Sequence, residues 1–222
     1  MKLMVVAICF ALLLASGATG QEIPKVNIPP QLWKKNWAFT EFQGSCVHAS
    51  AIMLWRWQGQ YEWAEFWGKK YYHGEYADRF HARCDREGVT YCDTYDQGDE
   101  SHLYWAIRTR RGAVVAISDG PLYGYHPTPS NPTGRIAHAV CLVHLDDKWA
   151  GILDNNDTGP GPGVVKWVDR RAFLEDWHNS GSWAWTPVST PPAPPQLIRK
   201  GSTFPIPLPF HPKPAVVPRP RM

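Results

Sequence analysis

The chain has 222 residues, a formal net charge of +3 and 21 prolines. This length is sufficient for one well-packed domain. Five basic residues and no acid lie in the last 36 residues, so the rest of the chain is slightly acidic despite the positive total. No basic stripe follows the body of the chain, and we therefore expect no nucleic-acid partner.

Residues 1–20 have the pattern of a secretory signal peptide. Lys2 precedes an apolar run from Met4 to Ala15, and small residues precede Gln21, where cleavage would occur. A membrane anchor is the alternative, but a spanning helix needs about 20 apolar residues. We expect a secreted or extracytoplasmic protein with no stable membrane insertion after cleavage.

The first half of the body is predicted to be helical. Residues 21–36 are proline-containing and should form an extended lead-in to a domain spanning residues 37–186. Every tryptophan lies between Trp33 and Trp185, which places the packed body in this part of the chain. Ser45–Gln58 is the strongest helix, because Ser45 suits an N-cap and apolar residues recur at helical spacing. Shorter helices are expected at Tyr61–Tyr72 and Ser101–Thr109, with an irregular polar stretch over 73–100.

The second half is predicted to form an antiparallel sheet. Apolar, β-branched runs indicate strands, and one short amphipathic segment indicates a helix at Ala172–Trp177. The expected strands are Ala113–Ser118, Ile136–Leu145, Trp149–Asp154, Val164–Val168 and Ser182–Thr186. Helices followed by antiparallel strands favour an α+β fold. Residues 187–222 are proline-rich and basic, and we expect a disordered tail.

Cys46 has the local setting of a nucleophile. It follows the cap residue Ser45, so its sulfur should lie at the first turn of a helix, where free amides and the helix dipole lower a thiol pKa. Packing or a disulfide is the simpler role for such a cysteine. Three more cysteines remain after cleavage: Cys84 and Cys92 close a short loop and can pair, and Cys141 should be buried.

His138 is the best candidate for the base that serves Cys46. It lies in an otherwise apolar strand between small alanines, and the next strand ends at Asp154, Asn155 and Asn156. A hairpin between the two strands would bring one of these residues beside the imidazole, as the orienting third member of a triad. Asn155 is preferred by register, and Asp154 and Asn156 remain open. His144 is the fallback base, because it shares the strand face of His138.

Two other histidine interpretations carry less weight. His48 is expected to be partly exposed on another face of the helix. His73, His81, Cys84 and Cys92 show no standard zinc spacing, so no metal is expected.

Three short patches resemble papain-like cysteine peptidases. Gly44–Ala51 resembles the nucleophile helix, His138–Val140 the histidine strand, and Ile152–Asn156 with the following glycines the asparagine turn. The chain order Cys, His, Asn agrees, and Trp167–Leu174 fits the bacterial branch that includes bacteriocin-processing double-glycine peptidases. The resemblance implies a papain-like fold whose helical half packs against a sheet half, a peptide or protein substrate, and no cofactor.

The sequence departs from this family at the residue that stabilises the oxyanion. The family places a Gln about two helical turns before the nucleophile, where this chain has Thr40, and the nearest Gln is Gln43. We take Gln43, with the Cys46 amide, as the expected oxyanion donor. The sequence therefore predicts a secreted cysteine hydrolase with Cys46, His138, Asn155 and Gln43 at its site. A thiol amidase or transferase for cell-wall or isopeptide substrates and an inactive papain-like binding module are the alternatives.

Overall fold

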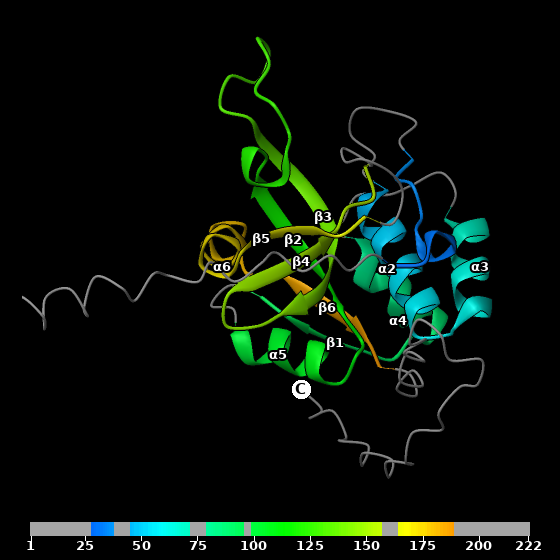
Figure 1. The fold of residues 1–222 in the computed structure, drawn as a ribbon. Helices are drawn as coiled ribbons and strands as arrows, with labels where there is room; N and C mark the ends of the chain where they lie inside the picture. The colour runs from blue at the N-terminus through cyan, green and yellow to red at the C-terminus, as the bar shows by residue number, and fades with distance from the viewer. Residues whose placement is uncertain (1–27, 38–44, 72–78, 96–98, 157–163, 189–222) are drawn as a thin grey trace, which may run out of the picture.

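A six-stranded antiparallel sheet organises the fold (Figure 1). The structure is a computed structural model that describes residues 28–37, 45–71, 79–95, 99–156 and 164–188. The strand order across the sheet is β1-β6-β2-β3-β4-β5. The strands are β1 (Tyr91–Thr94), β2 (Ala113–Asp119), β3 (Arg135–Leu145), β4 (Trp149–Leu153), β5 (Lys166–Asp169) and β6 (Ala184–Pro187).

Helices cover both faces of this sheet. One core contains residues of α2 (Cys46–Trp57), α3 (Tyr61–Lys70) and α4 (Phe80–Glu87), and the other contains residues of α5 (Glu100–Arg108) and α6 (Arg170–Asn179). In Figure 1, α2, α3 and α4 lie together on one side of the sheet. Two 3-10 helices, η1 (Pro30–Leu32) and η3 (Pro121–Tyr123), complete the elements of the described residues.

Strand β3 packs on both of these cores. Ala139 and Cys141 belong to the core with α2, whereas Val140 and Leu142 belong to the core with α5 and α6. Successive strand residues point to opposite faces, so a strand covered on both sides needs a nearly continuous apolar run. The predicted α+β fold, with helices packed on an antiparallel sheet, is confirmed.

Most predicted elements are present, and the irregular stretch 73–100 was the main error. That stretch holds α4 and β1, which the sequence did not indicate. Only Phe80 and Cys84 of α4 are buried, and only Tyr91 of β1, so neither element has a broad apolar face. Such short, mostly polar elements depend on their packing partners, because isolated short helices and edge strands are weakly favoured.

None of the four cysteines in the described residues takes part in a disulfide. A Cys84–Cys92 disulfide was therefore a wrong expectation: Cys84 is buried in α4, whereas Cys92 is exposed on the edge strand β1. Cys141 is buried, as expected, and its thiol donates to the carbonyl of Ser50 at 3.2 Å.

Several expectations concern parts of the chain outside the described residues. These are the signal peptide at 1–20, most of the lead-in up to residue 27, and the tail from residue 189 onward. Within the described residues, no helix is both long enough and apolar enough to cross a bilayer.

Candidate active site

Cys46 is the first residue of α2, as the sequence predicts. Ser45 occupies the N-cap position, but its side chain makes no capping hydrogen bond. Its hydroxyl instead donates to Asn36 Oδ1 and accepts the backbone N–H of Trp37 at 2.7 Å. The side chain of Ser45 therefore ties the lead-in segment to the start of the helix, and the free amides of the first turn remain available near the Cys46 sulfur.

The start of α2 lies against an open edge of β3. The pairing of β4 with β3 begins at Leu153 opposite Cys141, so β3 has no strand partner on that side at Ala139. The Ala139 carbonyl instead accepts Ser50 Oγ of α2 at 3.1 Å, and a backbone hydrogen bond from Ala139 reaches the Cys46 sulfur. The end of the β3–β4 pairing thus leaves room for the nucleophile helix beside the histidine strand.

His138 lies between the Cys46 thiol and a carboxylate. Its ring shares a hydrogen bond with the Cys46 sulfur. On its other side, His138 Nε2 lies 3.0 Å from Asp154 Oδ1. The side chains of His138 and Asp154 are 5% and 3% exposed, so water screens this pair very little. Thiol, imidazole and carboxylate form a hydrogen-bonded series that spans α2, β3 and the end of β4.

The residue that contacts the imidazole is Asp154, not the preferred Asn155. Leu142 of β3 pairs with Ile152 of β4, and Asp154 follows Ile152 by two residues, so it points to the same side of the sheet as His138. Asn155 points the other way, toward α2. Its Nδ2 donates to the carbonyls of Cys46 at 3.1 Å and Ala139 at 2.8 Å and to Ser50 Oγ at 2.8 Å. Asn155 joins α2 to β3, and Asn156 contributes its backbone amide to Asp154 Oδ1 at 2.9 Å.

The surroundings shift the pKa values of Cys46, His138 and Asp154 in the directions that favour their charged forms. Burial alone would raise the pKa of the Cys46 thiol, but the hydrogen bond and charge of His138, with backbone hydrogen bonds, lower it overall. Burial would lower the pKa of His138, but Asp154 and Cys46 raise it to about 9. Burial opposes ionisation of Asp154, yet the hydrogen bond and charge of His138 hold the pKa of the carboxyl well below its usual value. These shifts favour the thiolate–imidazolium form of the Cys46–His138 pair over the neutral form.

The lead-in segment holds the turn that carries Asp154. Trp33 Nε1 donates to the Asp154 carbonyl at 2.8 Å, and Asn36 donates its backbone N–H to the Asn155 carbonyl at 2.7 Å. Asn36 Nδ2 also donates to Asn156 Oδ1 at 2.7 Å. Sequence reasoning assigned this segment no role, because its polar groups act across more than a hundred residues and leave no local pattern.

The remaining candidate residues are placed elsewhere or lie outside the described residues. Gln43, the expected oxyanion donor, falls in the undescribed stretch 38–44. His144 Nε2 lies 2.9 Å from Asp146 Oδ2, next to Trp167, and does not join the Cys46 site. His48 is buried, contrary to expectation, and its Nδ1 accepts Trp67 Nε1 at 2.9 Å. Among the described residues, no group of three or more His, Cys, Asp or Glu side chains is arranged to hold a metal ion.

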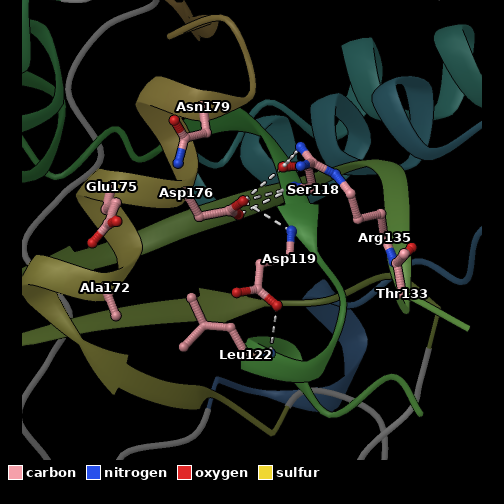
Figure 2. Close-up of a pocket in the computed structure, with 9 residues that line it drawn as sticks. All are labelled: Ser118, Asp119, Leu122, Thr133, Arg135, Ala172, Glu175, Asp176 and Asn179. Carbon is pink, nitrogen blue, oxygen red and sulfur yellow. Dashed lines mark hydrogen bonds between the residues drawn. The ribbon is translucent and has the colours of Figure 1, made fainter. Parts of the chain in front are cut away.

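A polar cavity of about 350 Å³ lies beside α6, and none of these candidates lines it. Figure 2 shows the carboxylate of Asp176 surrounded by donors from Ser118 and Asp119. The OH of Tyr123 also donates to this carboxylate at 3.0 Å. Because these donors satisfy the buried carboxylate, Asp176 acts as an anchor between α6 and β2.

Few known proteins match this chain. No family model matches the chain, and no curated protein matches it. Among solved structures, the chain is similar to the crystal structure of a candidate C39-like peptidase from Bacillus anthracis, with 18% identity and a TM-score of 0.36. The match covers 50% of this chain and 57% of that chain, so it spans little more than half of that structure.

Proposed function

We propose that this protein is a papain-like cysteine hydrolase that cleaves a peptide or amide bond, with Cys46 as nucleophile, His138 as proton carrier and Asp154 as the orienting acid. The hydrogen-bonded series from the Cys46 sulfur through His138 to Asp154 is the observation that carries the proposal. A nucleophile, a base within hydrogen-bond reach and a group that orients the base are the parts that covalent acyl transfer needs.

The proposed reaction transfers an acyl group from an amine to water. The Cys46 thiolate attacks the carbonyl carbon, and the amide of Cys46 at the start of α2 donates to the developing oxyanion. His138 gives its proton to the leaving amine, which departs and leaves a thioester. His138 then takes a proton from water as the water attacks the thioester, and collapse releases the acid and restores the thiolate.

Asp154 supports this cycle in two ways. It holds the imidazole through Nε2, so the other ring nitrogen faces the sulfur. Its charge also stabilises the imidazolium in the resting site. The pattern of residues 1–20 supports a site of action outside the cytoplasm.

The test compares the protein with Cys46→Ser and Cys92→Ser on one substrate panel of linear peptides, isopeptide-linked peptides and cell-wall peptide fragments. We expect Cys46→Ser to lose about 1,000-fold or more in hydrolysis rate, as active-site nucleophiles do. Cys92→Ser is the matched control, because Cys92 is exposed on β1, at the sheet edge opposite β4 and β5, and it should keep the wild-type rate.

Mass spectrometry of trapped reactions should find the acyl group on the peptide that contains Cys46. Acyl transfer to added amines in preference to water would identify the transferase alternative. Equal turnover by the protein and Cys46→Ser, or no covalent adduct and no turnover on the whole panel, would contradict the proposal.

A further inference from the structure

Both oxygens of the Asp154 carboxylate are occupied, and by different kinds of group. Oδ1 lies 3.0 Å from His138 Nε2 and accepts the Asn156 amide at 2.9 Å. Oδ2 accepts the OH of Tyr125 at 2.9 Å and the Nζ of Lys166 at 3.0 Å. The proposed orienting acid therefore bridges an imidazole and an ammonium group.

Lys166 is held in place rather than free at the surface. It is the first residue of β5, and its side chain is 16% exposed. Its Nζ donates to the Tyr123 carbonyl at 2.7 Å as well as to Asp154. The ammonium also lies 5.3 Å from the centre of the Tyr125 ring, so three contacts from two segments fix it.

Several groups face Asp154 from the elements packed against it. They are His138 from β3, Lys166 from β5, Tyr125 from the segment after η3 and, through the imidazole, Cys46 from α2. The Asp154 charge also contributes to the raised pKa of the buried Cys141 thiol of β3. Burial and the Asp154 charge raise the pKa of Tyr125, so Tyr125 is a neutral donor. Lys166 differs from Tyr125 because it adds a positive charge to the same oxygen.

We propose that Lys166 is a positioning residue of the Cys46–His138–Asp154 site, which fixes the second oxygen of Asp154 and sets the pH range over which the thiolate–imidazolium pair persists. This inference rests on the proposed function of that site. Two cations share one buried carboxylate, so the Lys166 charge weakens the hold of Asp154 on the imidazolium. The same positive charge favours the Cys46 thiolate over the neutral thiol.

Removal of the Lys166 charge should shift the ionisation of His138 and of Cys46 in a known direction. Without it, the imidazolium is more stable and gives up its proton at higher pH, and the thiolate is less stable and forms at higher pH. Both the ionisation of the Cys46 thiol and the loss of the His138 proton should therefore occur at higher pH. For a unit charge near a buried site, the displacement is on the order of one pH unit.

The experiment measures the rate of iodoacetamide alkylation of Cys46 against pH, by mass spectrometry of the Cys46 peptide, in the full chain. Cys92 in the same sample is the exposed reference thiol. Lys166→Met removes the charge and keeps the length of the side chain, Lys166→Arg keeps the charge, and Tyr125→Phe removes a neutral donor from the same oxygen. We expect an upward shift of about one pH unit in Lys166→Met and only a few tenths in Lys166→Arg and Tyr125→Phe.

A Lys166→Met profile that coincides with the wild-type profile would overturn the inference, as would equal shifts in Lys166→Met and Lys166→Arg. If Lys166→Met does not fold, Lys166→Gln takes its place, and the titration of the His138 ring by NMR gives an independent reading. Failure of the proposed function looks different. In that case the wild-type Cys46 would already react like Cys92 at every pH.

Discussion

Asp154 and Asn155 are neighbours in the chain, but their side chains point in opposite directions. Asp154 contacts the His138 ring, and Asn155 donates to the Cys46 and Ala139 carbonyls and to Ser50. One residue therefore acts on the charge of the site, and the next acts on its framework. The strand alternation that separates them is a property of the β3–β4 register.

Substitution of each residue by alanine should separate these roles. Asp154→Ala leaves His138 and Lys166 without their buried counter-charge, so the pKa of His138 should fall from about 9. Hydrolysis should drop by about 100-fold or more, because the imidazole loses its orienting partner. Asn155→Ala leaves buried acceptors without a donor, which should lower the free energy of unfolding by about 2–4 kcal/mol.

NMR titration of the His138 ring and urea denaturation measure the two effects. Asn155→Ala should leave the His138 titration within a few tenths of the wild-type value. A shift of the His138 pKa in Asn155→Ala as large as that in Asp154→Ala would contradict this division of roles.

The sequence predicted the positions of the two chemically informative residues better than their partners. Cys46 at a helix start and His138 in an apolar strand stand out against their local patterns. Asp154 was one of three adjacent candidates, and only the register selects it. Lys166 and Tyr125 could not be found in this way, because a polar residue at a strand start and a tyrosine in a loop have many ordinary explanations.

Among the elements, the connection between β2 and β3 positions Tyr125 near His138. It contains η3 and turns back at Gly134 into β3. The Tyr125 amide donates to the Gly120 carbonyl at 2.9 Å, and the Tyr125 ring lies 5.9 Å from the His138 ring. The conformation at Gly120 therefore affects the Asp154 end of the site.

Gly120 has no room for a side chain. A Cβ there would lie 2.1 Å from the Gly134 carbonyl oxygen, which is a backbone atom. Gly120→Ala should lower the free energy of unfolding by about 1–3 kcal/mol, the usual cost of overpacking, and displace Tyr125. Gly124→Ala is the matched control in the same loop: its φ is +83°, but nothing lies within 4 Å, so it should cost only about 1 kcal/mol.

Urea denaturation of both variants measures the difference. Equal losses in Gly120→Ala and Gly124→Ala would show that backbone conformation, not the close approach to Gly134, limits this loop.

Element prediction succeeded where burial is broad. Ten of the twelve residues of α2 are buried, and β3 contributes to both cores, so their apolar patterns are long. The prediction missed α4 and β1, which bury only Phe80, Cys84 and Tyr91 between them. Their positions depend on contacts with the rest of the molecule, and those contacts have no signature within a short window of sequence.

For the whole molecule, the proposed chemistry depends on a charge pair shared between its helical and sheet parts. The prediction that Cys46 and His138 form one site required these two parts to meet. The lead-in segment was not predicted to matter, yet Trp33 and Asn36 bind the turn that carries Asp154. Its contacts join residues far apart in the sequence, so they become visible only in the folded chain.

The most direct test is the rate of alkylation of Cys46 against pH in the wild type and in His138→Ala. The lowered pKa of Cys46 predicts that the wild-type thiol reacts at lower pH than an ordinary thiol, with a further change near pH 9 as His138 loses its proton. In His138→Ala the thiolate loses its counter-charge, so its reactivity should appear only near or above the usual thiol pKa of about 8.5. Identical profiles in the two proteins would contradict a thiolate–imidazolium pair at this site.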